Sequence, residues 1–354
     1  MGTPTQSRDN AKLTLPPEAA MRILARTFVL TVGLLATNNV LAWGAAGHQS
    51  SGAIADRLIA GTPAEKQVRK ILGSTLMTAS VWADCAKGVR KSNGSFQYVD
   101  AGKFAECAIF EKSASSRALM VSYVRRNWSN CSPGKGEDPC HKQYHYTDVA
   151  TGHDAYAVGL VGTSDHDVVG AISAAVAVLR DESVPSPFDL ATKKEALRVL
   201  AHLVGDLHQP LHVVSVYLDD HSRPVDPDAG TFSHDMETRG GNSLLRGSQN
   251  LHGDWDGIVI ALTADRLVDN AIEEARAIPL TSGEPSEWAA QWATETIRAG
   301  ERAFEGISYA PGAKKNTWNI TLPAGYSKVR QSIQREQLIK AGARLAQLLT
   351  TIWP

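Results

Sequence analysis

The sequence of 354 residues is poor in several features that would assign it to familiar classes of protein. It holds only four cysteines, and no two of them have the C-x-x-C spacing of thiolate zinc sites. Its main apolar run, at residues 28–36, is far shorter than the roughly 20 residues that a membrane-spanning helix needs. The formal net charge is −1, which excludes the broad basic footprint of a double-helix-binding protein. No repeat, low-complexity block or Gly/Pro-rich linker divides the chain, so we expect one large domain.

Residues 21–42 have the organisation of a secretory signal peptide. The stretch begins with MRILAR, continues through the short apolar run, and ends on Val40-Leu41-Ala42, a small-x-small cleavage pattern. We therefore expect cleavage between Ala42 and Trp43 and a secreted or periplasmic protein. Residues 1–20 are polar and are interpreted as an upstream segment, so the mature domain would span residues 43–354. We expect this mature chain to be a monomer.

Export also affects how the four cysteines are interpreted, because an oxidising compartment allows disulfides. Four cysteines permit three pairings. Cys131 and Cys140 enclose a loop full of turn-forming residues, CSPGKGEDPC, which favours a bond between them. The favoured pairing is then Cys131 with Cys140 and Cys85 with Cys107.

Apolar residues at helical spacing dominate the mature part, whereas alternating strand patterns are scarce. The pattern predicts an all-α protein with one long polar loop at residues 213–240. The helix in the stretch SDHDVVGAISAAVAVLRD is expected to begin at a Ser164 or Asp165 cap. The other clear helical stretches are residues 62–73, 193–210, 287–304 and 326–353.

Imidazole and carboxylate side chains recur in four short stretches that also carry Leu, Val or Trp. Two of the stretches place a histidine and an aspartate four residues apart, so both side chains leave one face of a helix. Such groups need partners if they are buried, and a metal ion can supply them. Ligands of this kind without thiolate favour zinc or a similar cation. The residues are His202, Asp206 and His212; His252 and Asp256; Asp84 with Lys87; and His145, Tyr146 and Asp148.

The motifs W-x4-H, WAD, HYTD, HLVGDLHQPLH, GGN and NLHGDWD occur in this order between Trp43 and Asp256. In this combination the chain resembles the secreted single-strand nucleases of the S1/P1 type. The resemblance implies a single, mostly helical domain around three clustered zinc ions.

The resemblance also implies a set of ligands for each ion. The first zinc would be held by Asp84, His145, His202 and Asp206, and the second by His212, His252 and Asp256. The third would take His48, a bridging Asp206, and Trp43 through its α-amino group and carbonyl oxygen. Asp84 and Asp206 would also be catalytic. An amide nitrogen is a poor ligand because its lone pair is delocalised, so Trp43 could bind zinc only as a new N-terminus.

The activity that the resemblance implies is hydrolysis of single-stranded RNA or DNA to 5′-phosphate products, with a separate 3′-nucleotidase activity left open. Tyr146 would stack on a base, Asp148 would hydrogen-bond its edge, Lys87 would contact phosphate, and Asn242 would contact the substrate. Two alternatives remain at this point: a related zinc phospholipase C, and a non-catalytic exported zinc-binding protein. His208 lies within the ligand-rich stretch but is expected to have a supporting role or to lie on the surface.

Overall fold

The structure is a computed structural model of the chain and describes residues 1–2 and 43–354. The predicted signal peptide therefore lies outside the described residues, and the predicted cleavage and domain boundary stay predictions. From Trp43 onward, the described residues belong to one compact unit. Among them, no helix is both long enough and apolar enough to cross a membrane.

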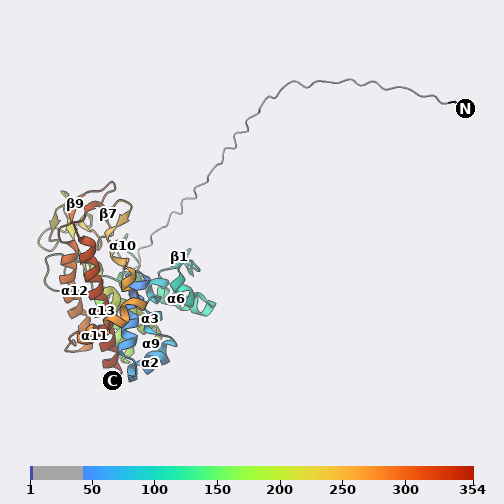
Figure 1. The fold of residues 1–354 in the computed structure, drawn as a ribbon. Helices are drawn as coiled ribbons and strands as arrows, with labels where there is room; N and C mark the ends of the chain where they lie inside the picture. Colours follow the sequence, from blue (N-terminus) through green and yellow to red (C-terminus); the bar gives the residue numbers. More distant parts are fainter. Residues whose placement is uncertain (3–42) are drawn as a thin grey trace. The chain divides into compact units, whose positions relative to one another are not determined.

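Helices make up most of the described chain (Figure 1). The α-helices are α1 (Ala45–Leu58), α2 (Pro63–Leu72), α3 (Leu76–Ala79), α4 (Trp82–Ala86), α5 (Ala108–Glu111), α6 (Ala114–Arg126), α7 (Cys140–Gln143), α8 (Val168–Leu179), α9 (Lys193–Leu207), α10 (Leu251–Asp256), α11 (Ala264–Ala277), α12 (Trp288–Phe304) and α13 (Tyr326–Ile352). Short 3-10 helices are η1 (Ala105–Cys107), η2 (Pro210–His212), η3 (His234–Met236), η4 (Ile260–Leu262) and η5 (Pro285–Glu287).

Helix α9 runs through the core and carries part of the site. The side chain of Thr192 accepts the main-chain N–H of Glu195 at 3.1 Å and so caps its first turn. All of its residues except Lys193, Lys194 and Arg198 are buried. It packs against α8, α1 and α13, and α1 also packs against α13 and α11. A helix buried on nearly every side can hold polar side chains only if they find partners inside the protein.

The strands are short and serve mainly to hold loops together. They are β1 (Val89–Ser92), β2 (Ser95–Tyr98), β3 (Val149–Ala150), β4 (Val214–Ser215), β5 (Tyr217–Leu218), β6 (Pro224–Val225), β7 (Leu244–Arg246), β8 (Gln249–Asn250), β9 (Ser308–Pro311) and β10 (Trp318–Thr321). One sheet has the order β8-β7-β10-β9, with β7 parallel to β10, and the other strands form the pairs β1–β2, β3–β4 and β5–β6. The parallel β3–β4 pair matters most for the site, because it brings the chain after His145 alongside the chain after His212.

The mostly helical fold class is confirmed, and two local expectations are corrected. Helix α8 begins at Val168, because the carboxylate of Asp167, rather than Ser164 or Asp165, accepts the N–H groups of Val169 and Gly170. The stretch 213–240 is not uniformly a polar loop. Its first six residues are buried and include β4 and β5, so only the later part has the expected character.

Both expected disulfides are confirmed: Cys85 is bonded to Cys107, and Cys131 to Cys140. The first ties α4, which carries Asp84, to η1. The second closes the loop that leads into α7, which ends two residues before His145. The bonds therefore fix two segments that contribute side chains to the site.

Candidate metal centre

Eight of the predicted ligand side chains meet in three buried groups, although they come from five different helices and one loop. In each group the ligand atoms lie within 4.8 Å of one another. The groups are His48, His202 and Asp206; Asp84, His145 and His202; and His212, His252 and Asp256. His202 belongs to two groups, so the first two are adjacent.

The pair His202 and Asp206 forms the middle of the site. Helical spacing puts both on one face of α9, and His202 Nε2 lies 3.0 Å from Asp206 Oδ2. The same oxygen lies 2.8 Å from His145 Nδ1, whereas Asp206 Oδ1 lies 3.3 Å from His48 Nε2. The approach of α1 to α9 depends on Gly205, where a Cβ atom would lie 2.7 Å from His48 Nδ1. Each oxygen of Asp206 thus faces a different part of the cluster.

Main-chain carbonyl groups orient three of the imidazoles. In each case a ring Nδ1 donates to a carbonyl oxygen: His202 to Ser80 at 2.6 Å, His212 to His145 at 2.7 Å, and His252 to Gly240 at 2.7 Å. A carbonyl oxygen can only accept, so each Nδ1 carries a proton, and in the neutral ring each Nε2 presents a lone pair.

The Nε2 atoms of His212 and His252 face each other at 3.1 Å. Burial lowers the pKa of His212 and lowers that of His252 to about 3, so neither ring holds a second proton at neutral pH. Two lone pairs at this distance repel each other unless a cation lies close to both. The arrangement fits a pair of imidazole ligands to a metal ion.

The carboxylates show the same need for positive charge. Burial opposes ionisation of Asp206, but His202 and His212 hold its pKa well below its usual range. Burial raises the pKa of Asp256 well above its usual range, and the charges of Asp84 and Asp206 add to the effect. Gln209 donates to Asp256 Oδ1 at 2.8 Å, yet within the described residues Oδ2 has no hydrogen-bond partner. Buried carboxylates so close together fit a site for cations.

Asp84 and Lys87 lie at the outer side of the cluster. Lys87 Nζ is 2.8 Å from Asp84 Oδ1, and 20% of the Lys87 side chain is exposed. Burial opposes ionisation of Asp84, but Lys87 and His202 bring its pKa down to about 2. The ammonium group is therefore held beside the cluster and within reach of solvent.

Trp43, the first residue of the described range 43–354, is fully buried. The N–H of Gly44, the next residue, donates to the carbonyl oxygen of Asp256 at 2.9 Å, which fixes the chain beside a predicted ligand. The indole packs in a small apolar cluster with Ile54 and Leu267. Ligation by the Trp43 main chain stays a prediction.

The predicted substrate residues lie around the cluster and outside the three groups. Tyr146 and Asp148 follow His145 and are partly exposed. Burial, with Glu237 adding and Arg239 opposing, raises the pKa of Asp148 to about 7. Asn242 donates its side-chain amide to the carbonyl oxygen of Arg239 at 2.9 Å, so this group is engaged within its own turn.

Sequence reasoning missed several supporting residues. Gln209 holds Asp256, and its signal was its place between two ligand histidines. Gly240 gives its carbonyl to His252; its φ is +56°, and a Cβ there would lie 2.2 Å from the carbonyl oxygen of Leu211. Of the two roles expected for His208, the structure excludes the surface one: the side chain is buried, its ring centre lies 6.0 Å from that of Trp292, and Nδ1 donates to the carbonyl of Val204.

One family model and two plant proteins are similar to this chain. A family model described as S1/P1 Nuclease matches residues 127–354, which include six of the eight clustered side chains. Endonuclease 2 of Arabidopsis thaliana is 27% identical over 338 residues, covering 92% of this chain and 96% of that protein. Endonuclease 4 of Arabidopsis thaliana is 30% identical over 171 residues, covering 45% of this chain and 50% of that protein. The resemblance seen in the motifs is thus confirmed: the chain belongs to the S1/P1 nuclease family and is a metal-dependent phosphodiesterase.

Proposed function

We propose that this protein is an exported zinc-dependent endonuclease that hydrolyses single-stranded RNA and DNA and leaves 5′-phosphate ends. The observation that carries the proposal is the meeting of eight buried imidazole and carboxylate side chains in three groups. Nitrogen and oxygen ligands without thiolate suit zinc. The two similar Arabidopsis proteins are both named endonucleases, which supports the same substrate class.

The eight side chains would hold three zinc ions. Asp84, His145, His202 and Asp206 would bind the first, and His212, His252 and Asp256 the second. His48 and Asp206 would bind the third together with Trp43. A bridging role for Asp206 is supported by its two oxygens, one of which faces His145 and His202 while the other faces His48.

The third site would be completed by export. Signal cleavage after Ala42 would convert the Trp43 nitrogen from an amide into a free α-amine, whose pKa near roughly 7.7–8.0 lets a metal displace its proton. The burial of Trp43 and the bond from Gly44 to Asp256 support a fixed position for this terminus.

Bound zinc polarises a phosphoryl oxygen and lowers the pKa of a water molecule, which supplies charge stabilisation and a nucleophile near neutral pH. The protein supplies the rest. Asp84 positions the Lys87 ammonium, which can pair with a phosphate oxygen on its exposed side. The carbonyl groups that accept from Nδ1 of His202, His212 and His252 keep these rings in their ligand tautomers.

Substrate selection would come from the residues after His145. The ring of Tyr146 would stack on an unpaired base, a contact that every base can make and a paired base cannot. Asp148 would accept a hydrogen bond from the base edge, and Asn242 would contact the same nucleotide. A terminal 3′-phosphate could bind at the same zinc ions, so 3′-nucleotidase activity is part of the proposal.

The two alternatives are less well supported. A phospholipase C would need an apolar entrance for lipid, and both similar proteins are named endonucleases. A non-catalytic zinc protein would be expected to have closed, four-ligand sites, whereas the second predicted site has only three protein ligands.

The experiment is an assay of the purified chain beginning at Trp43, supplied with zinc, on four substrates. These are single-stranded RNA, single-stranded DNA, double-stranded DNA and a phosphatidylcholine analogue. We expect rapid cleavage of both single strands, slow cleavage of the duplex, and products that a 5′-phosphate-dependent ligase accepts. Hydrolysis of the lipid alone would establish the phospholipase alternative, and hydrolysis of none would leave only zinc binding.

A further inference from the structure

Residues 88–126, called here the accessory segment, differ in charge from the rest of the chain. They contain seven Lys and Arg against three Asp and Glu, a net charge of +4, whereas the whole chain carries −1. They contain β1, β2, η1, α5 and α6, and they precede the stretch that matches the family model. None of the predicted ligand or substrate residues lies in this segment.

Two of the seven basic residues of this segment, Lys91 and Lys103, lie against aromatic rings. Lys91 Nζ is 5.6 Å from the centre of the Phe96 ring and 5.9 Å from that of Trp128, just beyond the segment. Lys103 Nζ is 5.1 Å from the centre of the Phe104 ring. Both lysines are exposed, and the three aromatic side chains are partly exposed. A polyanion with unpaired bases could thus meet charge and a flat apolar face together.

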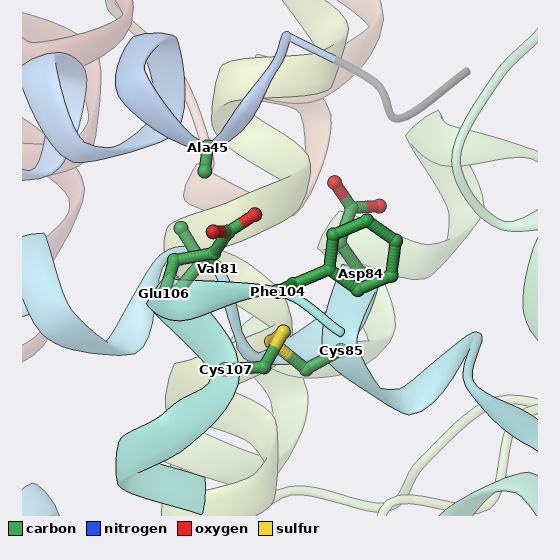
Figure 2. Close-up of a pocket in the computed structure, with 7 residues that line it drawn as sticks. All are labelled: Ala45, Val81, Asp84, Cys85, Phe104, Glu106 and Cys107. Carbon is green, nitrogen blue, oxygen red and sulfur yellow. A yellow bond between two sulfur atoms is a disulfide. The ribbon is translucent and has the colours of Figure 1, made fainter. Parts of the chain in front are cut away.

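The segment lies directly beside the metal centre. It follows Lys87 in the chain, and its Cys107 is bonded to Cys85, the residue after Asp84. Phe104 and Asp84 line one small cavity together, and Figure 2 shows the ring of Phe104 beside the Asp84 carboxylate. On the other side, Trp128 stacks on His141, one helical turn before His145, with ring centres 5.7 Å apart.

Local contacts hold the segment in this position. The carboxylate of Glu111 accepts from the Tyr98 hydroxyl at 2.6 Å and from the N–H of Gly102 at 2.7 Å, which fixes the loop that carries Lys103 and Phe104. Together with the disulfide, these bonds keep Phe104 at a fixed place relative to Asp84. A preordered surface costs less entropy when a ligand binds.

We propose that the accessory segment binds the single-stranded substrate beyond the nucleotide that is cleaved, with Lys91 and Lys103 pairing with phosphates and Phe104 stacking on a base. This inference rests on the proposed function. Basic residues along the backbone path and aromatic faces for the bases are the combination that binds single strands without sequence preference. Tyr146 and Asp148 do not line the cavity of Phe104, so the two stacking positions are distinct.

The first test uses substrate length. We compare a dinucleotide with a twelve-nucleotide single strand, in the wild-type enzyme and in Lys91→Glu/Lys103→Glu. The KM for the long strand should rise about tenfold or more, and its salt dependence should weaken by about 0.7 in slope for each phosphate that no longer pairs with a lysine. The kcat and KM for the dinucleotide should stay unchanged. Lys66→Glu/Lys70→Glu, which changes the charge equally on exposed residues of α2, is the matched control.

The second test separates stacking from charge. Phe104→Ala should raise the KM for the long strand about tenfold, and Phe104→Tyr, which keeps a flat ring, should restore it. Ile109→Ala is the control, because Ile109 is an exposed apolar residue of α5 outside the cavity.

The outcomes separate the two proposals. A wild-type enzyme that cleaves neither substrate contradicts the proposed function. A wild-type enzyme that cleaves both, with lysine and Phe104 variants that change neither KM, contradicts the accessory site alone. Equal reductions on both substrates would show that the segment supports the fold of the centre and does not bind substrate, and this too would overturn the inference.

Discussion

Two groups of side chains in this protein have the same kind of composition and opposite surroundings. His153, Asp226 and Asp228 bring their ligand atoms within 4.8 Å of one another, as His212, His252 and Asp256 do. The side chains of the first group are 20%, 47% and 22% exposed, and those of the second 4%, 7% and 7%. Water can solvate the first group, and its imidazole can simply pair with the carboxylates.

The second group has no such freedom. Carbonyl oxygens fix the protons of His212 and His252 on Nδ1, which turns their lone pairs toward each other. Among the described residues, no main-chain carbonyl accepts from the Nδ1 of His153 in the same way. Burial and a fixed tautomer, more than the choice of residues, therefore distinguish a metal centre from a surface ion pair.

Metal removal should have the largest effect, because only the buried group is expected to depend on a bound metal for activity and stability. Chelation is expected to abolish hydrolysis and lower the Tm by roughly 5–10 °C, because a metal bound at 100 times its Kd stabilises by about 2.7 kcal/mol. Scanning calorimetry with and without chelator measures the shift. The variant Asp226→Asn/Asp228→Asn should lose activity and Tm on chelation to the same extent as the wild type. A wild-type melting curve that chelation leaves unchanged would argue against a buried metal centre.

Substitution of single carboxylates comes next. Asp206→Asn should lower kcat by about a thousandfold, because it removes the charge of the proposed bridging ligand, worth several kcal/mol to the transition state. Asp228→Asn, the same chemical change in the exposed group, should alter kcat by less than about twofold. Steady-state kinetics on single-stranded RNA measures both, and similar reductions in the two variants would mean that burial does not distinguish the two groups.

A smaller effect concerns buried Trp43, the predicted start of the mature chain. A chain with one residue added before Trp43 should bind two zinc ions instead of three, because an amide nitrogen replaces the α-amine. Elemental analysis counts the ions, and activity on single-stranded RNA should fall when the third ion is missing. A chain with one residue added after Pro354 is the control, and equal zinc content in both would refute activation by signal cleavage.

The smallest expected effect concerns Asp148, which is partly exposed, lies near the centre and belongs to none of its groups. Its pKa is raised to about 7, so between its unfolded value near 3.8 and pH 7 the folded state retains a proton that the unfolded state releases. Ionisation of Asp148 therefore lowers the free energy of unfolding as the pH rises through this range.

The amide side chain of Asp148→Asn does not ionise, so this variant lacks the pH-dependent loss of stability. Its Tm relative to the wild type should rise between pH 5 and pH 8, which thermal melts at several pH values would show. Asp226→Asn should show no such trend, because the pKa of Asp226 is lowered and its titration ends below this range. A flat difference for Asp148→Asn would mean that its carboxyl is solvated like that of Asp226.

The sequence was sufficient to predict the helical class, the two disulfides and the family, because helical periodicity, cysteine number and short motifs are local properties. It predicted the eight clustered side chains through motif positions. It was less successful where packing decides. Residues 213–218 looked like part of a polar loop and became buried strands, because β3 supplies a partner from a distant segment.

The sequence by itself determined which residues could bind metal, since imidazole and carboxylate groups four residues apart share a helix face wherever the helix lies. Only the tertiary structure decided which of them need a metal. Burial removes water from His202, Asp206 and their neighbours, and carbonyl groups of residues as distant as Ser80 and Gly240 fix where the protons lie. The predicted bond between Cys85 and Cys107 brings the accessory segment close to α4, but only packing in the tertiary structure decided that Phe104 lines a cavity together with Asp84.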